Sequence, residues 1–463
     1  MKNLTFGVYL TALAGVGSAA PHFSSSSSGP ASAPTGATYA SGFDMTKSWA
    51  NLSPYKNADT FGVPKGMPQG CELSQVHVLH RHAERFPTSN LLDGRGMGDF
   101  ASKLVNYTKA KPGKMVAKGP LKFLNDWEYV IGENTLMENG AATEDASGAD
   151  FWIKYGRLLY RPGRDNVAAW NESLNVYPNG TARPKPVFIP RYTKNALSRL
   201  ASYLPEDFNL TAYDVLAMQN LCVYENTSLG GSFFCSLFTE QEWKDFAYNV
   251  DIQYYGNFAF GSPTGRAQGI GYVLELAARL EGKLIHSSDT SINSTYDDNT
   301  AQFPLGQPFY MDMSHDDIIL SVISALGLEH FKYGPHGLPI NIDHAPSNRT
   351  FALNDLTPFG ARFMSEVWTC PSNVSFDSLD PILYVNPRLE STRNTKRYIR
   401  FVLNNAPLPL DGLVGCEDSQ NGFCAVDGFL SGVPTLKENA KYQEACFGEY
   451  PTGKQVEDGV PYS

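Results

Sequence analysis

The stretch VLHRHAERFP, residues 78–87, places two histidines and two arginines within six positions, after an alternating apolar run and before a proline. Arginine binds phosphate oxygens through its planar guanidinium fork, and a histidine beside such cations can be a covalent nucleophile toward phosphorus. We therefore predict that Arg81 and Arg85 flank His82 and grip a tetrahedral oxyanion. The alternative is a solvated loop in which the arginines pair with carboxylates such as Glu84.

Metal binding is a second alternative for this stretch, because His77, His80 and His82 could supply imidazole ligands. Neighbouring positions of a strand point to opposite faces, so His77 and His80 should diverge. No acidic residue stands at a recognisable ligand spacing. The sequence therefore favours the oxyanion site, and we predict no metal.

A second cluster, MSHDDI at residues 313–318, stands at the start of a predicted helix. A capping box between Ser314 and Asp317 would account for Asp317, but it does not require His315 or Asp316. A helix N-terminus also favours anions. We predict that His315 donates to a phosphate oxygen and that Asp316 is the general acid for the leaving oxygen.

Asp316 can act as a general acid only if its carboxyl is protonated when the ester is bound. Nearby arginines and the helix N-terminus should lower the pKa of this carboxyl, whereas a proton donor needs a higher one. A bound phosphate would raise the pKa again, and an acidic working pH would keep the proton in place. Activity at low pH is therefore predicted.

Both clusters follow a predicted strand and precede a predicted helix. Residues 73–80 and 309–313 alternate as strands do, and helical spacing follows near 100–107 and over 319–326, before a glycine. In open α/β sheets the ligand lies beyond the carboxyl ends of the strands, which is where both clusters would meet. A further strand is predicted at 397–404, followed by a turn and a short edge strand.

The chain also divides by composition. A lysine, an apolar stretch and small residues at the start predict a cleaved secretory signal, and the Ser-, Ala-, Gly- and Pro-rich segment after it predicts a flexible arm. The predicted organisation is a signal peptide at 1–19, a flexible arm at 20–42, an α/β catalytic domain at 43–199 and 301–463, and a helical insertion domain at 200–300.

Several features are typical of a secreted glycoprotein. Nine Asn-x-Ser/Thr sequons can be read outside the signal: Asn51, Asn106, Asn171, Asn179, Asn209, Asn226, Asn293, Asn348 and Asn373. Seven cysteines in an oxidising compartment predict disulfides. Their spacing suggests Cys222–Cys235 and Cys416–Cys424, with Cys71–Cys370 as a third bridge and Cys446 unpaired.

Charge and hydropathy limit the partners. A formal net charge of −10 at pH 7 argues against nucleic-acid binding, so an anionic substrate needs a local cationic pocket. No apolar run beyond the signal approaches the roughly 20 residues that span a bilayer. We expect neither a nucleic-acid nor a membrane partner, and nothing in the sequence sets the oligomeric state.

The two clusters together resemble a known family, the secreted histidine acid phosphatases, in the branch that includes fungal phytases and acid phosphatases. RHAERFP is similar to that family's Arg-His-Gly-x-Arg-x-Pro signature, and SHDD is similar to its distal His-Asp pair. His315 stands 233 residues after His82, in the same order. Further resemblance runs through YDVLAMQNLCVYE, GSPTGRAQGIGYV and RYIRFVLNNAPLPL, so it covers most of residues 70–430.

The resemblance implies a phosphoglycerate mutase-like α/β sandwich with an inserted, mainly helical smaller domain. It also implies an extracellular acid phosphatase that hydrolyses small phosphate monoesters, with inositol phosphates such as phytate as candidates, in two steps. His82 would attack phosphorus, Asp316 would protonate the leaving alcohol, and the phosphate oxygens would be held by Arg81, Arg85 and His315. No metal or organic cofactor is implied.

The chain departs from the family pattern at two points. Ala83 replaces the glycine after the nucleophile, where glycine would permit a positive φ. The family's further phosphate-binding arginine is matched only loosely by VFIPRYTKNALSRLASY, where we favour Arg191 over Arg199. These departures keep one alternative open, a catalytically impaired glycoprotein of the same fold that binds anions. A phosphotransferase or mutase is a third hypothesis.

Overall fold

The computed structural model of the chain describes residues 42–89, 93–113, 116–159, 170–172, 187–334, 337–380, 394–450 and 456–461. The predicted signal peptide lies outside these residues, as does the predicted flexible arm up to residue 41. Among the described helices, none combines the length and the apolar character that crossing a membrane requires.

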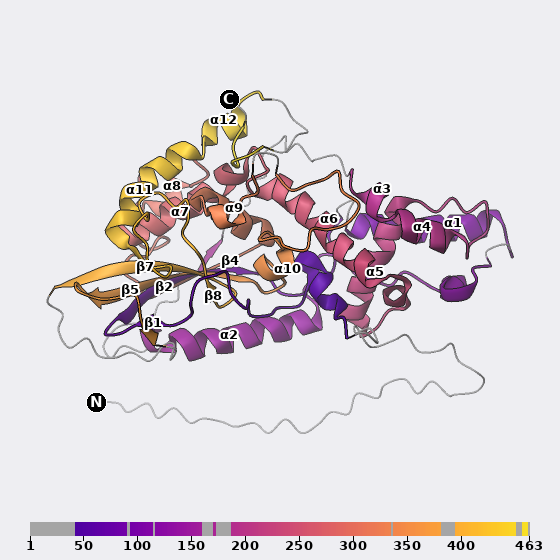
Figure 1. Cartoon of the computed structure of the whole chain (residues 1–463), viewed down its shortest axis with the longest axis horizontal. Coiled ribbons are helices and arrows are strands. Elements are labelled where there is room, and N and C mark those ends of the chain that lie inside the picture. Colours follow the sequence, from indigo (N-terminus) through magenta and orange to yellow (C-terminus); the bar gives the residue numbers. More distant parts are fainter. Residues whose placement is uncertain are drawn as a thin grey trace, which may run out of the picture. The chain divides into compact units, whose positions relative to one another are not determined.

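A mixed sheet organises the described chain (Figure 1). Its strand order is β3-β4-β2-β5-β7-β8, and β9 also pairs with β7. The strands are β2 (Glu72–Arg81), β3 (Trp170–Glu172), β4 (Phe309–Ser314), β5 (Arg362–Pro371), β7 (Thr395–Leu403), β8 (Ala406–Pro407) and β9 (Cys424–Ala425). The pair β1 (Met67–Pro68) and β6 (Leu379–Asp380) forms a separate two-stranded sheet. The three strands predicted from alternation, and the short edge strand, are therefore present.

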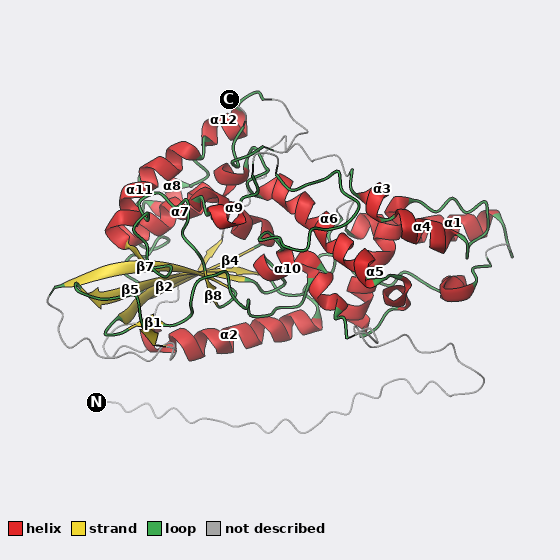
Figure 2. Ribbon diagram, viewed as in Figure 1, coloured by secondary structure: helices red, strands yellow, loops and turns green. Residues whose placement is uncertain are grey.

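The central strands are buried because helices cover both faces of the sheet (Figure 2). Helix α2 (Glu138–Leu159) packs on β2 and β4 from one side. On the other side lie α7 (Gly265–Glu281), α9 (Asp316–Leu326) and α11 (Val426–Asn439), with α7 and α9 in extensive mutual contact. This cover explains why β2 is buried along its second half and does not keep a simple alternating pattern.

A helical region stands beside the sheet. It contains α1 (Gly94–Ala110), α3 (Ile189–Tyr192), α4 (Lys194–Ala201), α5 (Ala212–Leu229) and α6 (Glu240–Phe258). Side-chain capping boxes, Thr211 with Asp214 and Thr239 with Glu242, begin α5 and α6. Helix α1 packs on α5, whereas α7 packs on α9. The predicted domain boundaries remain a prediction.

Short elements complete the described chain. They are α8 (Ser294–Asp297), α10 (Leu353–Leu356), α12 (Tyr442–Phe447), and the 3-10 helices η1 (Met45–Ser48), η2 (Ala50–Leu52), η3 (Gly119–Asn125), η4 (Phe233–Leu237) and η5 (Glu329–Phe331). Of these, η2 becomes part of the candidate site.

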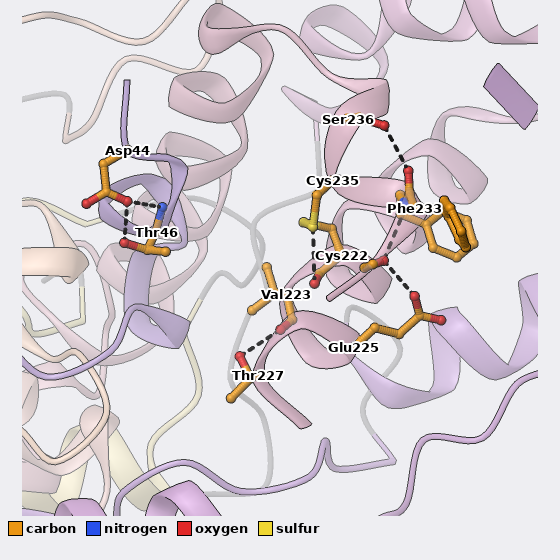
Figure 3. The surroundings of a disulfide bond; sticks show 11 residues. Asp44, Thr46, Cys222, Val223, Glu225, Thr227, Phe233, Cys235 and Ser236 are labelled. Atoms are coloured by element: carbon orange, nitrogen blue, oxygen red, sulfur yellow. Dashed lines mark hydrogen bonds between the residues drawn. A yellow bond between two sulfur atoms is a disulfide. The ribbon is translucent and has the colours of Figure 1, made fainter. Parts of the chain in front are cut away.

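The three predicted disulfides are confirmed: Cys71–Cys370, Cys222–Cys235 and Cys416–Cys424. Cys446 is a free cysteine, as expected. Figure 3 shows the surroundings of the bridge that ties α5 to η4. Beside it, Glu225 accepts hydrogen bonds from Trp127 Nε1 at 2.8 Å and Ser232 Oγ at 2.6 Å, so the helical region is cross-linked by both covalent and polar contacts.

Candidate active site

The register of two parallel strands brings the two predicted clusters together. Arg81 of β2 pairs with Ser314 of β4, and both strands end at these residues. The backbone N–H of His82 then donates to the Ser314 carbonyl at 3.1 Å. Because parallel strands share one carboxyl edge, the residues that follow each strand must be neighbours.

His82 is held in one tautomer by its own loop. Its Nδ1 lies 2.8 Å from the Ala83 carbonyl, which can only accept, so Nδ1 carries the hydrogen. Nε2 accepts a hydrogen bond from Arg85 Nε at 3.1 Å. Burial and the neighbouring Arg81 charge lower the pKa of His82 to about 3. The imidazole is therefore neutral above that pH, with a lone pair on Nε2.

Arg81 is buried and links three segments. Its Nη1 donates to the carbonyls of Asn51 and Thr357, the latter at 2.7 Å. Its Nη2 lies 2.9 Å from Asp316 Oδ2, and the guanidinium stacks 4.5 Å from the centre of the Phe359 ring. These contacts fix the direction of the cation before any ligand arrives.

Asp316 accepts from three donors. Arg81 Nη2 and Asn51 Nδ2, the latter at 2.7 Å, both reach Oδ2. The Asp317 backbone N–H reaches Oδ1 at 3.0 Å. Burial tends to raise the pKa of this carboxyl, but the Arg81 charge and the Asn51 hydrogen bond outweigh it and lower the pKa to about 2. The free site therefore holds Asp316 as a carboxylate.

His315 and Asp317, the neighbours of Asp316 in the second cluster, have pKa values that are shifted in opposite directions. The His315 ring lies 5.1 Å from the His82 ring, centre to centre, and burial lowers the pKa of His315. Burial and the Asp316 charge raise the pKa of Asp317 to about 7. The alternative explanation by a capping box does not hold, because α9 begins at Asp316 with His315 as its N-cap and without a side-chain capping bond.

Ala83 fits its position without backbone strain. Its φ is not positive, so this site does not need the freedom of glycine. The Ala83 N–H donates to Glu144 Oε1 of α2 at 2.7 Å. Glu144 thus holds the residue whose carbonyl fixes the His82 tautomer.

A pocket opens beside these residues. Three of its lining side chains belong to the clusters or contact them directly, namely Arg81, Arg85 and Asn51. The other lining residues are Leu52, Thr88, Asp93, Asn220, Tyr224, Val250, Gln253 and Tyr254. Among the described lining residues, the charged ones are Arg81, Arg85 and Asp93, and most of the others are neutral and polar. This composition suits a single oxyanion.

Arg191, the remaining predicted phosphate ligand, makes no described contact with the residues of the two clusters. It lies on α3 with its side chain 43% exposed, 3.9 Å from the Asp343 carboxylate. Arg199, the disfavoured candidate, binds both carboxylate oxygens of Glu242 and the Leu237 carbonyl. The described contacts of Arg199 thus join α4 to the start of α6.

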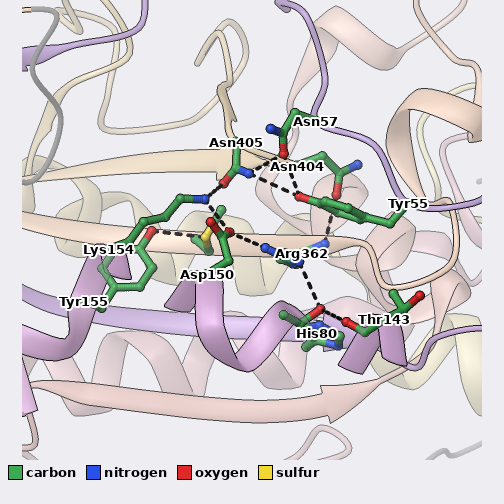
Figure 4. A network of polar contacts seen from close by, with 12 residues as sticks. Tyr55, Asn57, His80, Thr143, Asp150, Lys154, Tyr155, Arg362, Asn404 and Asn405 are labelled. Carbon is green, nitrogen blue, oxygen red and sulfur yellow. Dashed lines mark hydrogen bonds and ion pairs between the residues drawn. The ribbon is translucent and has the colours of Figure 1, made fainter. Parts of the chain in front are cut away.

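The other histidines of the first cluster take part in packing. His77 stacks on the Tyr310 ring at 4.5 Å between centres. His80 packs edge-on against Phe151. It lies beside a polar network around Arg362, Asp150 and Lys154 (Figure 4). His77 and His80 thus pack against aromatic rings, whereas the His82 ring accepts a hydrogen bond from the Arg85 side chain.

Sequence reasoning missed several residues that shape this site. The sequence around Asn51 indicates only a sequon, and Glu144 lies in a helix with no motif around it. Tyr254 and Gln253 of α6 line the pocket from the helical region. All of them are far from residues 80–85 in sequence, so only the tertiary structure could place them.

The chain matches a known protein family over most of its length. The model of the Histidine phosphatase superfamily (branch 2) matches residues 72–174 and 159–404. Phytase A of Aspergillus fumigatus is 28% identical over 455 residues, covering 86% of this chain and 90% of the relative. Phytase A of Emericella nidulans is 26% identical with the same coverage of both.

Solved structures share the fold. The phytase from D. castellii superposes with a TM-score of 0.63 at 20% identity, covering 89% of both chains. The Bifidobacterium longum multiple inositol polyphosphate phosphatase, in complex with inositol hexasulfate, gives a TM-score of 0.50 at 12% identity and covers 82% of this chain and 96% of its own. The expected α/β fold is thereby confirmed.

Proposed function

Because this chain belongs to branch 2 of the histidine phosphatase superfamily, we propose that it hydrolyses phosphate monoesters through a phosphohistidine on His82 at acidic pH. Family membership and the Phytase A relatives confirm the predicted enzyme class, a phosphoric monoester hydrolase. They give no support to the non-catalytic alternative. The observation that carries the proposal is the neutral His82, with Nδ1 bound to a carbonyl and Nε2 beside Arg85.

In the first step the Nε2 lone pair forms a bond to phosphorus and the bond from phosphorus to the leaving oxygen breaks. The leaving oxygen takes a proton from Asp316. Arg81, Arg85 and His315 hold the non-bridging oxygens, and they stabilise the charge of the transition state more than that of the bound ester. The fixed guanidinium of Arg81 reorganises little during the step.

In the second step a water oxygen bonds to phosphorus, the bond from phosphorus to Nε2 breaks, and His82 recovers its lone pair. Asp316, now a carboxylate, accepts the proton of the attacking water. Phosphate then leaves. The protein returns to its starting protonation state, with one ester and one water consumed.

The protonation of Asp316 depends on the substrate. In the free site this carboxyl is anionic over most of the pH range, with its pKa at about 2. A dianionic phosphoryl group would compete for the Arg81 charge and add negative charge next to Asp316, and both effects raise its pKa. Acidic conditions then supply the proton, so the proposed activity belongs to low pH.

The proposed substrates are small phosphate monoesters, including inositol phosphates. Support comes from relatives named Phytase A and from a structural neighbour that was solved with inositol hexasulfate. Among the described lining residues, the cations are Arg81 and Arg85, which suits one phosphate group. We propose Arg191 as a further phosphate ligand on the family resemblance alone.

We also propose that the enzyme works outside the cell, without a nucleic-acid or membrane partner. The signal-like start, the sequons and the disulfides support this location. The net charge of −10 supports the absence of a nucleic-acid partner.

The test is phosphate release from p-nitrophenyl phosphate, glycerol phosphate and phytate between pH 2.5 and 7.5, with chelator present. We expect an optimum in the acid range for the wild type and loss of release for His82→Ala. Acid quench of the wild type during turnover should trap phosphate on a histidine. Equal release by both proteins would overturn the proposal, and phosphate transfer to an acceptor in excess of release would favour a phosphotransferase.

A further inference from the structure

Asn51 occupies an unexpected place for a glycosylation sequon. It lies in the short helix η2 and is only 5% exposed. Its Nδ2 donates to Asp316 Oδ2 at 2.7 Å and to the Tyr254 hydroxyl at 2.9 Å. Its backbone carbonyl accepts from Arg81. One residue thus contacts both members of the Arg81–Asp316 ion pair.

The chemistry of a glycan conflicts with these contacts. An N-linked sugar is bonded to the Asn Nδ2, which leaves that nitrogen one hydrogen instead of two. Both hydrogens of Asn51 are already donated, one to the buried Asp316 carboxylate and one to the Tyr254 hydroxyl, and a sugar there would occupy the site. By contrast, the sequon residues Asn106, Asn209, Asn293, Asn348 and Asn373 are exposed. Among the sequon side chains that the structure describes, Asn51 alone is buried.

We propose that Asn51 is a positioning residue that holds the Asp316 carboxylate against Arg81, and that it carries no glycan in the active enzyme. The role rests on the proposed phosphatase function, whereas the missing glycan does not. The backbone conformation supports the positioning role of Asn51. Ala50, which precedes Asn51, has a φ of 53°, and this conformation costs free energy and is kept where the surroundings require it.

The expected consequence is a shift in pH dependence. Donation from Asn51 stabilises the ionised form of Asp316, so removal of this donor should raise the pKa of the carboxyl. A general acid with a higher pKa stays protonated to a higher pH. The alkaline limb of log kcat, which reports ionisations of the enzyme–substrate complex, should therefore move to higher pH by about one unit, a tenfold change in the protonation equilibrium. A residue that only supports the fold would lower activity without moving this limb.

Three variants separate the possibilities. Asn51→Ala removes the donor, and Asn51→Asp keeps the size but places a second carboxylate beside Asp316, so its shift should be at least as large. Ser53→Ala is the matched control, because it abolishes the same sequon and leaves the Asn51 amide intact. Ser53 is 2% exposed and its Oγ has no hydrogen-bond partner, so alanine should be tolerated.

The choice of ester sharpens the measurement. An alkyl ester such as glycerol phosphate has a strongly basic leaving oxygen and needs a proton donor, whereas p-nitrophenyl phosphate needs one much less. We expect the shift in both Asn51 variants with glycerol phosphate, a weaker effect with p-nitrophenyl phosphate, and a wild-type profile for Ser53→Ala. Unshifted limbs in both Asn51 variants, or the same shift in Ser53→Ala, would overturn the positioning role.

Glycan mapping tests the second half of the proposal without an activity assay. The wild type is expressed in a eukaryotic host, and peptides are analysed by mass spectrometry after enzymatic deglycosylation in H₂¹⁸O. We expect an unmodified Asn51 and label at some of the exposed sequons. Label at Asn51 in the fraction that releases phosphate would overturn the proposal. Failure of the wild type to release phosphate would instead refute the proposed function, and the positioning role with it.

Discussion

His80 and His82 stand two positions apart at the end of one strand, and in both the pKa is lowered to about 3, with burial as the main cause. Their surroundings differ. His80 is completely buried, and neither ring nitrogen makes a hydrogen bond. His82 keeps partial access to solvent, with one nitrogen bound to a carbonyl and the other beside Arg85. A low pKa alone thus does not mark a nucleophile. What sets His82 apart is a tautomer fixed by the Ala83 carbonyl, with the Nε2 lone pair directed at Arg85, a residue that lines the pocket.

The two arginines near these histidines differ in the same way. Arg81 and Arg362 are both buried, with relative exposures of 1% and 3%. Arg362 binds Asp150 and Ser147, and its guanidinium stacks 4.2 Å from the centre of the Tyr55 ring (Figure 4). Arg81 also has several partners, but it lines the pocket. One face of the strand end is sealed by α2, and the other is left open for a ligand.

The largest difference in kcat is expected between the alanine variants of the two histidines. His82→Ala removes the proposed nucleophile and should lower kcat by about 10³-fold or more. His80→Ala leaves a cavity beside Phe151 and should lower the free energy of unfolding by roughly 2 kcal/mol, with kcat within a few-fold of the wild type. Steady-state kinetics and urea denaturation on both variants provide the measurement. A large loss of kcat in folded His80→Ala would show that the sealed face takes part in the chemistry.

Substitution of Arg81 should lower kcat/KM by about two orders of magnitude more than substitution of Arg362 does. Arg81→Lys loses the fork that joins the Thr357 carbonyl to Asp316, so kcat/KM should fall about 100-fold. Arg362→Lys should leave kcat/KM nearly unchanged and cost about 2 kcal/mol of stability, because charged hydrogen bonds are lost in a buried network. The contrast fails if both variants lose activity in proportion to their stability.

Much of the fold that carries this contrast could be read from the sequence. Strands β2 and β4 alternate, and α9 ends at Gly327, whose φ of 71° is the left-handed helix end that glycine favours. Strand β5 gives no such signal, because its sequence, RFMSEVWTCP, lacks a regular alternation of apolar and polar residues. Strands with an alternating sequence are thus the predictable ones, although the second half of β2 is as buried as β5.

The site was predictable only where its residues are close in sequence. His82, Arg81, Arg85, His315 and Asp316 form two short motifs, and one strand register joins them. Asn51 lies 265 residues from Asp316, and its local pattern indicated a sequon. The capping-box alternative does not hold for a physical reason, because the Asp317 N–H is taken by the Asp316 carboxylate. Local rules cannot anticipate a partner that the tertiary fold supplies.

A smaller loss of kcat is expected on substitution of Glu144, whose side chain contacts both the sealed face and the open face of the strand end. Its Oε1 accepts from the Ala83 N–H, and its Oε2 lies 3.8 Å from His80 Nε2. Glu144→Ala should loosen the carbonyl that fixes the His82 tautomer and lower kcat about tenfold with little change in KM. Glu144→Gln keeps an acceptor oxygen and should stay near the wild type. Equal kcat losses in the two variants would mean that the negative charge matters and the hydrogen bond does not.

A change in stability alone should come from Asp317, the second carboxyl of the MSHDDI cluster. Asp317 is 7% exposed, and burial together with the Asp316 charge raises its pKa from 3.8 to about 7. The folded chain therefore binds this proton more tightly than the unfolded chain does. The resulting stabilisation is fully present below about pH 4 and is lost as pH rises through about 7.

Asp317→Asn mimics the protonated form and should remove this pH dependence. Against the wild type, its free energy of unfolding should be similar at pH 3.5 and higher by up to about 4 kcal/mol at pH 7.5, because a shift of about three pKa units is worth about that much. Urea denaturation at both pH values gives the comparison, with Glu138→Gln at an exposed carboxylate as the control. If Asp317→Asn were less stable than the wild type at pH 7.5, the Asp317 carboxylate would have to be paired in the folded chain. The open face would then hold two compensated charges, and the division of roles between Asp316 and Asp317 would fall.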